Sequence, residues 1–156
     1  MKTFQLATLF VFTFSFAQAY LDCRDSQGIQ ISYVVSFNSN QAAASNVNNY
    51  GQPIIIINPN IYNQLSPAIA GFVNAHECAH HYYGHVYNMT HRIPRNPFTD
   101  EFDADCFAVK FLRDTNQLNQ NDFEQIKGFL STLHADESHP SGYDRIQYAI
   151  QCANSY

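Results

Sequence analysis

The sequence His76-Glu77-Cys78-Ala79-His80 stands near the middle of the chain, in a stretch that favours a helix. Ser66-Pro67 ahead of it predicts the helix start, because serine caps helices and proline fits the first helical position. We expect this helix to run to about Tyr87. Residues four apart share one helix face, so both imidazoles can point at one metal ion, with Glu77 beside them as a base for a metal-bound water. The alternative is a polar helix face with coincidental histidines.

A catalytic zinc ion needs a third protein ligand and an open position for water. Glu101 is the candidate, 21 residues after His80, near the start of a helix expected over residues 99–113. Asp105 follows on the same helix face, where it could hold a ligand imidazole by its free N–H. The alternative is that Glu101 and Asp103 only complement the N-terminus of that helix.

Three motifs in this order resemble the gluzincin metallopeptidases of the HtpX and CAAX-prenyl-endopeptidase type. They are His76-Glu77-Cys78-Ala79-His80 with His85, Glu101-Phe102-Asp103-Ala104-Asp105, and His139-Pro140-Ser141 with Arg145. The apolar run Ile54–Ile57 is similar to that family's edge strand beside the active site. The resemblance covers most of the chain after the first fifty residues.

The resemblance implies Zn²⁺ as the cofactor and hydrolysis of peptide bonds as the reaction. The residues it assigns are His76, His80 and Glu101 as zinc ligands, Glu77 as the base, Asp105 and Arg145 behind the ligands, and His139 near the zinc. The chain departs from the family in lacking the transmembrane helices of many members. It also has Cys78 where a small or aliphatic residue is usual. These departures leave the substrate range open.

His139 has three possible roles. It could donate to the oxyanion that develops during hydrolysis, occupy the open zinc position of a latent enzyme, or only brace its loop. Pro140 restricts its backbone to extended conformations, and Ser141 can cap the helix that follows. Among the other histidines, His81 is expected on the surface, about 100° around the helix from His80. By the same periodicity His85 faces away from His76, so we interpret it as structural rather than as a ligand.

The fold class predicted by the whole sequence is α+β. Alternating apolar residues over 29–37 and the β-branched run Ile54–Ile57 predict two strands, joined by a polar surface loop. Helical patterns follow, including two further helices from about residues 121 and 141. Strands first and helices later indicate a small N-terminal sheet followed by the helix that carries the active site. Together with the resemblance above, this order leads us to expect a minimal zincin-like metallopeptidase domain.

Four cysteines, at positions 23, 78, 106 and 152, predict two disulfides with three possible pairings. Cys78 is two residues from each of His76 and His80, so it points away from the face that would bind a metal. The helix of Glu101 must approach that face, which disfavours a bond between Cys78 and Cys106. We therefore prefer Cys23–Cys78 with Cys106–Cys152.

The N-terminus has the pattern of a secretory signal peptide. Lys2 is followed by an apolar run and then by Ala17-Gln18-Ala19, which predicts a signal peptide over residues 1–19 and a single domain over 20–156. The apolar run is too short to span a bilayer, so we expect no stable membrane anchor after cleavage. The net charge is −5 without a basic stripe, which argues against a nucleic-acid partner.

Together these patterns predict a secreted or periplasmic zinc metallopeptidase that acts as a monomer on a peptide or protein substrate. The alternative is a catalytically idle zincin-like domain that binds a peptide or partner protein. Zinc-dependent hydrolysis of a non-peptide amide is a third interpretation.

Overall fold

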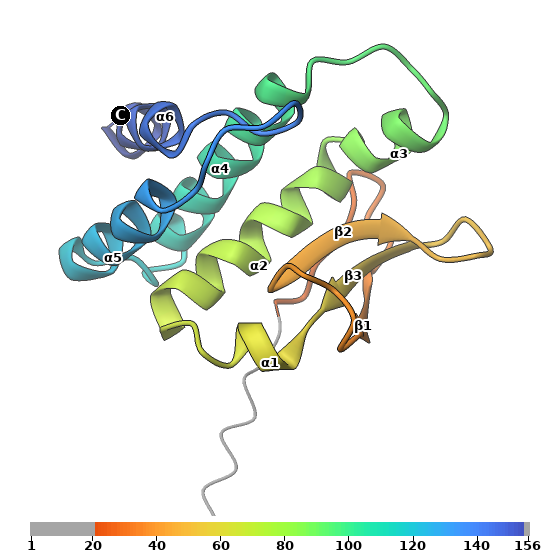
Figure 1. Ribbon diagram of the computed structural model, residues 1–156, viewed down its shortest axis with the longest axis horizontal. Coiled ribbons are helices and arrows are strands. Elements are labelled where there is room, and N and C mark those ends of the chain that lie inside the picture. Colours follow the sequence, from red (N-terminus) through yellow and green to blue (C-terminus); the bar gives the residue numbers. More distant parts are fainter. Residues whose placement is uncertain (1–20, 155–156) are drawn as a thin grey trace, which may run out of the picture.

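The computed structural model describes residues 21–154, which form the predicted α+β arrangement of a sheet followed by helices (Figure 1). The strands are β1 (Ser32–Val35), β2 (Ala43–Val47) and β3 (Pro53–Ile57). The helices are α1 (Pro59–Tyr62), α2 (Pro67–Tyr82), α3 (His85–Thr90), α4 (Pro97–Asp114), α5 (Gln120–Ser131) and α6 (Gly142–Asn154). The expected signal peptide lies outside the described residues. Within residues 21–154, no helix combines the length and the apolar character that a bilayer-spanning segment needs.

The sheet has β3 at its centre, parallel to β1 and antiparallel to β2. Two predictions are wrong here. The run Ile54–Ile57 is not an edge strand, and the segment before it is not only a surface loop, because it contains the edge strand β2. Its small and polar residues have weak β propensity. The strand forms because it pairs with β3 and buries Ala43 in the core.

Helix α2 lies between the sheet and α4, and most of its residues are buried (Figure 1). Its first turn follows the prediction, since the Ser66 hydroxyl accepts a hydrogen bond from the backbone N–H of Ile69. His81, expected on the surface, is instead buried, so that prediction is wrong. Its Nε2 donates to the backbone oxygen of Ile54 at 2.9 Å, because β3 covers this side of the helix. Burial lowers the pKa of His81, so its ring is neutral.

The end of α2 is set by Gly84. The helix stops at Tyr82, short of the predicted Tyr87, because Gly84 has a φ of 73°. Glycine adopts this left-handed conformation without the steric penalty of a side chain. His85 therefore starts the separate helix α3, and its direction no longer follows the periodicity of α2.

The two disulfides have the preferred pairing. Cys23 is bonded to Cys78 and Cys106 to Cys152, with Cα–Cα distances of 5.6 and 5.4 Å. The first bond ties the N-terminal segment to the face of α2 that is turned away from His76. The second bond ties α4 to α6.

Small residues allow the last three helices to pack closely. Ala104 and Ala108 of α4 are fully buried, which allows α4 to approach α2 closely. A Cβ atom at Gly142 would clash with the backbone oxygen of Leu130, so glycine permits α6 to begin against the end of α5. This start of α6 determines where Arg145 enters the interior.

Candidate metal centre

Three predicted ligands converge in the structure. The Nε2 atoms of His76 and His80 are 3.1 Å apart. The two carboxylate oxygens of Glu101 lie 3.5 Å from Nε2 of His76 and 3.3 Å from Nε2 of His80. Over residues 21–154, these three side chains form the cluster of His, Cys, Asp or Glu that could hold a metal ion, with ligand atoms within 4.8 Å of one another. Spacing along α2 aligns the histidines, and the packing of α4 against α2 brings up the carboxylate.

The geometry and chemistry of this cluster fit zinc. Tetrahedral zinc with bonds of about 2.1 Å places neighbouring ligand atoms roughly 3.4 Å apart. The separations of 3.1 to 3.5 Å lie close to that value, with each histidine facing a different oxygen of Glu101. One oxygen of Glu101, Oε2, is buried and accepts no hydrogen bond, although Arg145 Nη1 lies 3.3 Å away. A buried carboxylate oxygen without a hydrogen bond is costly, and a metal ion beside it would add to the charge compensation that Arg145 provides. Two imidazoles and one carboxylate are also a donor set that zinc uses.

Asp105 contacts the ring of His76 on the side away from the cluster, and Arg145 contacts Asp105. Oδ1 of Asp105 lies 2.9 Å from Nδ1 of His76, which assigns the proton to Nδ1 and leaves the Nε2 lone pair facing the cluster. Arg145 donates from Nε and Nη2 to the two oxygens of Asp105 at 2.8 and 2.7 Å. Buried Glu101, Asp105 and Arg145 together carry one net negative charge, which favours a cation between the ligands.

The pKa shifts agree with ionised carboxylates at the cluster. Burial alone would raise the pKa of Glu101, but the hydrogen bond with His80 and the charges of His76, His80 and Arg145 lower it to about 2. Burial likewise opposes the ionised form of Asp105, and the hydrogen bonds from Arg145 and His76 outweigh it and lower that pKa. Burial lowers the pKa of His76, but the hydrogen bond to Asp105 and the charge of Glu101 raise it overall.

His85 supports the second imidazole, a contact that the helical periodicity did not predict. Its Nδ1 is 3.1 Å from Nδ1 of His80, and its Nε2 is 3.6 Å from Asp100. Asp100 is itself paired with Arg95. Burial lowers the pKa of His85 to about 4, so its neutral ring can accept the Nδ1 proton of His80. The glycine just before His85 was the available sign that α2 ends there.

Glu77 lies in the same cleft and is held by the edge strand. Its Oε2 accepts hydrogen bonds from the backbone N–H of Ser45 at 2.7 Å and from the Ser45 hydroxyl at 2.5 Å. Nothing in the sequence pointed to Ser45, because β2 was not predicted. The cleft has a volume of about 250 Å³, and its lining residues include Ser45, His76, Glu77, His80, Glu101 and His139.

A family model described as Peptidase U49 matches residues 41–155, which include every residue of the site described above. The chain belongs to the Peptidase U49 family. Searches of curated proteins and of solved structures return no match. The membership supports a peptidase, but it does not single out the HtpX and CAAX-prenyl-endopeptidase type.

In this Peptidase U49 chain, His139 reaches the edge of the cluster from the loop before α6. Its Nε2 lies 3.9 Å from Oε1 of Glu101, while its Nδ1 lies 2.9 Å from Asp136. Asp136 also accepts a hydrogen bond from the backbone N–H of Ser138, and these contacts, the backbone one foremost, lower the pKa of its carboxyl group. Asp136, which the sequence did not single out, thus orients the ring so that Nε2 faces the cleft.

Proposed function

We propose that this Peptidase U49 member is a zinc-dependent peptidase with zinc held by His76, His80 and Glu101. The observation that supports it most directly is the convergence of three candidate ligand atoms, within 4.8 Å of one another, in a cleft that also contains Glu77. When bound, zinc would polarise the scissile carbonyl and lower the pKa of a water ligand to about 7. The residues around it then have separate tasks.

Glu77 acts as the proton carrier. Its carboxylate takes the proton of the attacking water and later passes it to the leaving amine, as a general base and then a general acid. Ser45 keeps the carboxylate at the wall of the cleft through two donors to one oxygen, Oε2. The other oxygen, Oε1, is left for the proton transfer.

His139 stabilises the developing negative charge. Its ring is oriented by Asp136, with Nε2 directed toward the carboxylate of Glu101 and the cleft. A donor already aimed at the place where charge develops lowers the barrier without reorganisation during the reaction. Asp105 and Arg145 keep the first imidazole fixed.

We place the enzyme outside the cytosol, as a secreted or periplasmic protein. Its two disulfides support this location, because such bonds persist in oxidising compartments. The proposal includes cleavage of a signal peptide over residues 1–19 and a single domain over 20–156.

The test is peptidase activity on casein, with and without a chelator, together with the zinc content. We expect about one zinc per chain and loss of activity on chelation, with recovery when zinc is added. Glu77→Gln should retain zinc and lose at least about 10²-fold in kcat, because it removes the proton carrier. His76→Ala should lose both zinc and activity. A zinc-loaded protein without any activity on casein or on a peptide library would instead indicate the catalytically idle binding domain.

A further inference from the structure

A second cavity opens directly beside the cleft that holds the candidate ligands. It has a volume of about 380 Å³. The two cavities share His76, Glu77, Glu101 and His139 among their lining residues. A peptide whose scissile bond lies at Glu77 would therefore have a neighbouring side chain at the mouth of the second cavity.

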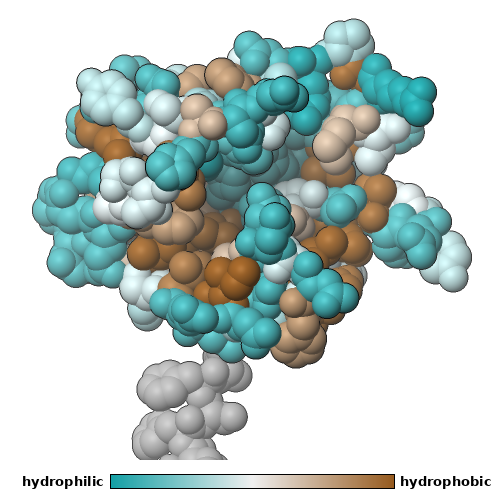
Figure 2. All heavy atoms as spheres, in the orientation of Figure 1, coloured by the Kyte–Doolittle hydropathy of each residue, from teal (hydrophilic) through white to brown (hydrophobic). Residues whose placement is uncertain are grey.

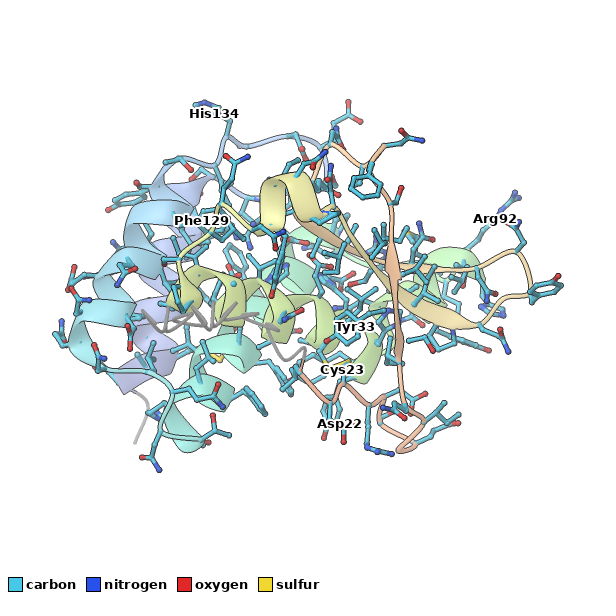
Figure 3. All side chains as sticks on the ribbon, turned by 90° about the horizontal axis from the view of Figure 1, so that it is seen from below. Asp22, Cys23, Tyr33, Arg92, Phe129 and His134 are labelled. Carbon is cyan, nitrogen blue, oxygen red and sulfur yellow. A yellow bond between two sulfur atoms is a disulfide. The ribbon has the colours of Figure 1, made fainter. Side chains whose placement is uncertain are left out.

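One wall of this second cavity is apolar, and another carries Glu77, Glu101, His139 and Arg145. Its apolar side chains include Ile61, Leu65, Phe72, Val73, Phe129 and Leu133. They come from α1, the turn after it, α2, and α5 with its following turn. Figure 2 shows a hollow on this face, with apolar residues gathered beside it over α1 and the start of α2. Figure 3 shows Phe129 and His134, which both line the cavity, at the end of the molecule opposite Arg92.

Val73 connects the apolar wall to the reacting groups. It precedes His76 by three residues and Glu77 by four, so the three side chains lie on one face of α2. The apolar surface therefore begins one helical turn from the base. A side chain in this cavity belongs to a residue next to the scissile bond and not to a distant one.

Two of the charged groups at the cavity are held in ion pairs. Arg145 pairs with Asp105 and Glu101, and Asp136 pairs with the ring of His139. An acidic substrate side chain would lie against the apolar wall with the carboxylates of Glu77 and Glu101 nearby, which is costly. A large apolar side chain would lose only its contact with water.

We propose that this cavity selects the substrate: the enzyme cleaves peptides next to a large aliphatic or aromatic residue, whose side chain fills the space between α1, α2 and α5. The size agrees, because a cavity of about 150 Å³ already holds a benzene molecule. This inference rests on the proposed peptidase function.

The experiment uses a random decapeptide library with the zinc-loaded protein. Cleavage products are sequenced to give the residues on both sides of each cleaved bond. Leu, Ile, Phe and Met should be enriched on one side of the bond. In peptides resynthesised from a cleaved sequence, Ala in place of Leu at that position should lower kcat/KM at least about 10-fold. Asp there should lower it further.

Two variants reduce the volume of the cavity. Leu133→Trp and Val73→Phe should reverse the preference toward Ala, while zinc content stays at the wild-type level. Leu118→Trp is the matched control, because Leu118 is also partly buried against the core but lines neither cavity. It should leave the preference unchanged. Thermal unfolding identifies any variant that does not fold. If one of the two cavity variants does not fold, the other still tests the proposal.

A second experiment measures peptide binding separately from peptide cleavage. The same library is passed over immobilised, zinc-loaded Glu77→Gln, and the retained peptides are sequenced. Cleavage without an apolar preference would overturn the cavity assignment and leave the peptidase intact. Absence of cleavage, with apolar peptides retained by Glu77→Gln but not by Glu77→Gln/Leu133→Trp, would overturn the peptidase and support the cavity. If the protein neither cleaves peptides nor retains apolar ones, the peptidase function and the cavity assignment are both overturned.

Discussion

The carboxylate of Glu77 is tied to the sheet by one residue, Ser45. The serine supplies both a backbone N–H and a hydroxyl to Oε2, and the hydroxyl also lies 2.8 Å from the backbone oxygen of Glu77. Such a clamp restricts where the second carboxylate oxygen can point. The position of the base therefore depends on a side chain outside the helix that carries it.

We predict that Ser45→Ala lowers kcat about 10-fold, because the looser carboxylate spends less time in the reactive geometry. KM and zinc content should change little, since the substitution affects neither the ligands nor the second cavity. Ser45→Thr keeps the hydroxyl and should retain most of the activity. Steady-state kinetics of the three proteins provide the measurement. Wild-type kcat in the alanine variant would show that the backbone N–H alone holds Glu77.

Asp105 links buried Arg145 to the imidazole of His76, a candidate metal ligand, so its charge should matter for stability. We predict that Asp105→Asn lowers the free energy of unfolding of the metal-free protein by about 3 kcal/mol near pH 7. The reason is that the substitution leaves Arg145 buried without its full counter-charge. The pKa of Asp105 is lower in the folded protein than in the unfolded chain. Its stabilising effect is therefore present above the unfolded value of about 3.9 and is lost as pH falls through the folded pKa.

Urea unfolding of chelated protein at neutral and acidic pH measures this effect. The difference in the free energy of unfolding between wild type and Asp105→Asn should become smaller as the pH falls to about 3 and below. Asp103→Asn on the same helix is the control, because Asp103 is partly exposed and its pKa is raised, first by burial and then by the charge of Asp100. That variant should not be destabilised near neutral pH. If this difference in the free energy of unfolding were the same at all pH values, Asp105 would not be ionised in the folded protein as we infer.

At the level of helices, the break between α2 and α3 brings His85 back toward the ligands. A continuous helix would place His85 on the side away from His76, whereas the turn at Gly84 brings its Nδ1 to 3.1 Å from that of His80. The short helix α3 thus contributes to the orientation of the candidate ligand His80. A helix end rather than a helix face creates this contact.

We predict that Gly84→Ala destabilises the protein by about 1–2 kcal/mol, because alanine pays a steric penalty in the left-handed conformation. Gly128→Ala is the matched control. Gly128 lies within α5 with open space around its Cα, so alanine there should stabilise by up to about 1 kcal/mol. Denaturant unfolding of both variants compares them directly. Equal stability of Gly84→Ala and wild type would mean that the turn tolerates another conformation.

For the whole molecule, the disulfides connect parts that are distant in sequence. Their sequence separations are 55 and 46 residues. Closing loops of about 50 residues in the unfolded chain corresponds to roughly 4 kcal/mol per bond in the chain-entropy account. Both bonds lie away from the candidate ligands, so they stabilise the fold without taking part in the chemistry.

We predict that Cys23→Ala/Cys78→Ala and Cys106→Ala/Cys152→Ala each lower the urea midpoint strongly. Both variants should still bind zinc at temperatures where they are folded. Unfolding curves and zinc content, measured on the same samples, provide the test. Loss of zinc from a folded Cys23→Ala/Cys78→Ala variant would show that this bond also shapes the metal site.

The spacing of His76 and His80 and the opposite direction of Cys78 follow from the sequence by itself, because helical periodicity is a local property of the chain. The cap at Ser66 and the α+β order are local in the same sense. The tertiary structure alone decided that residues 43–47 form the edge strand, that Ser45 meets Glu77, that His81 is buried under β3, and that His85 supports His80. Each of these depends on which element packs against which, and such long-range packing overrides the weak local preferences of small and polar residues.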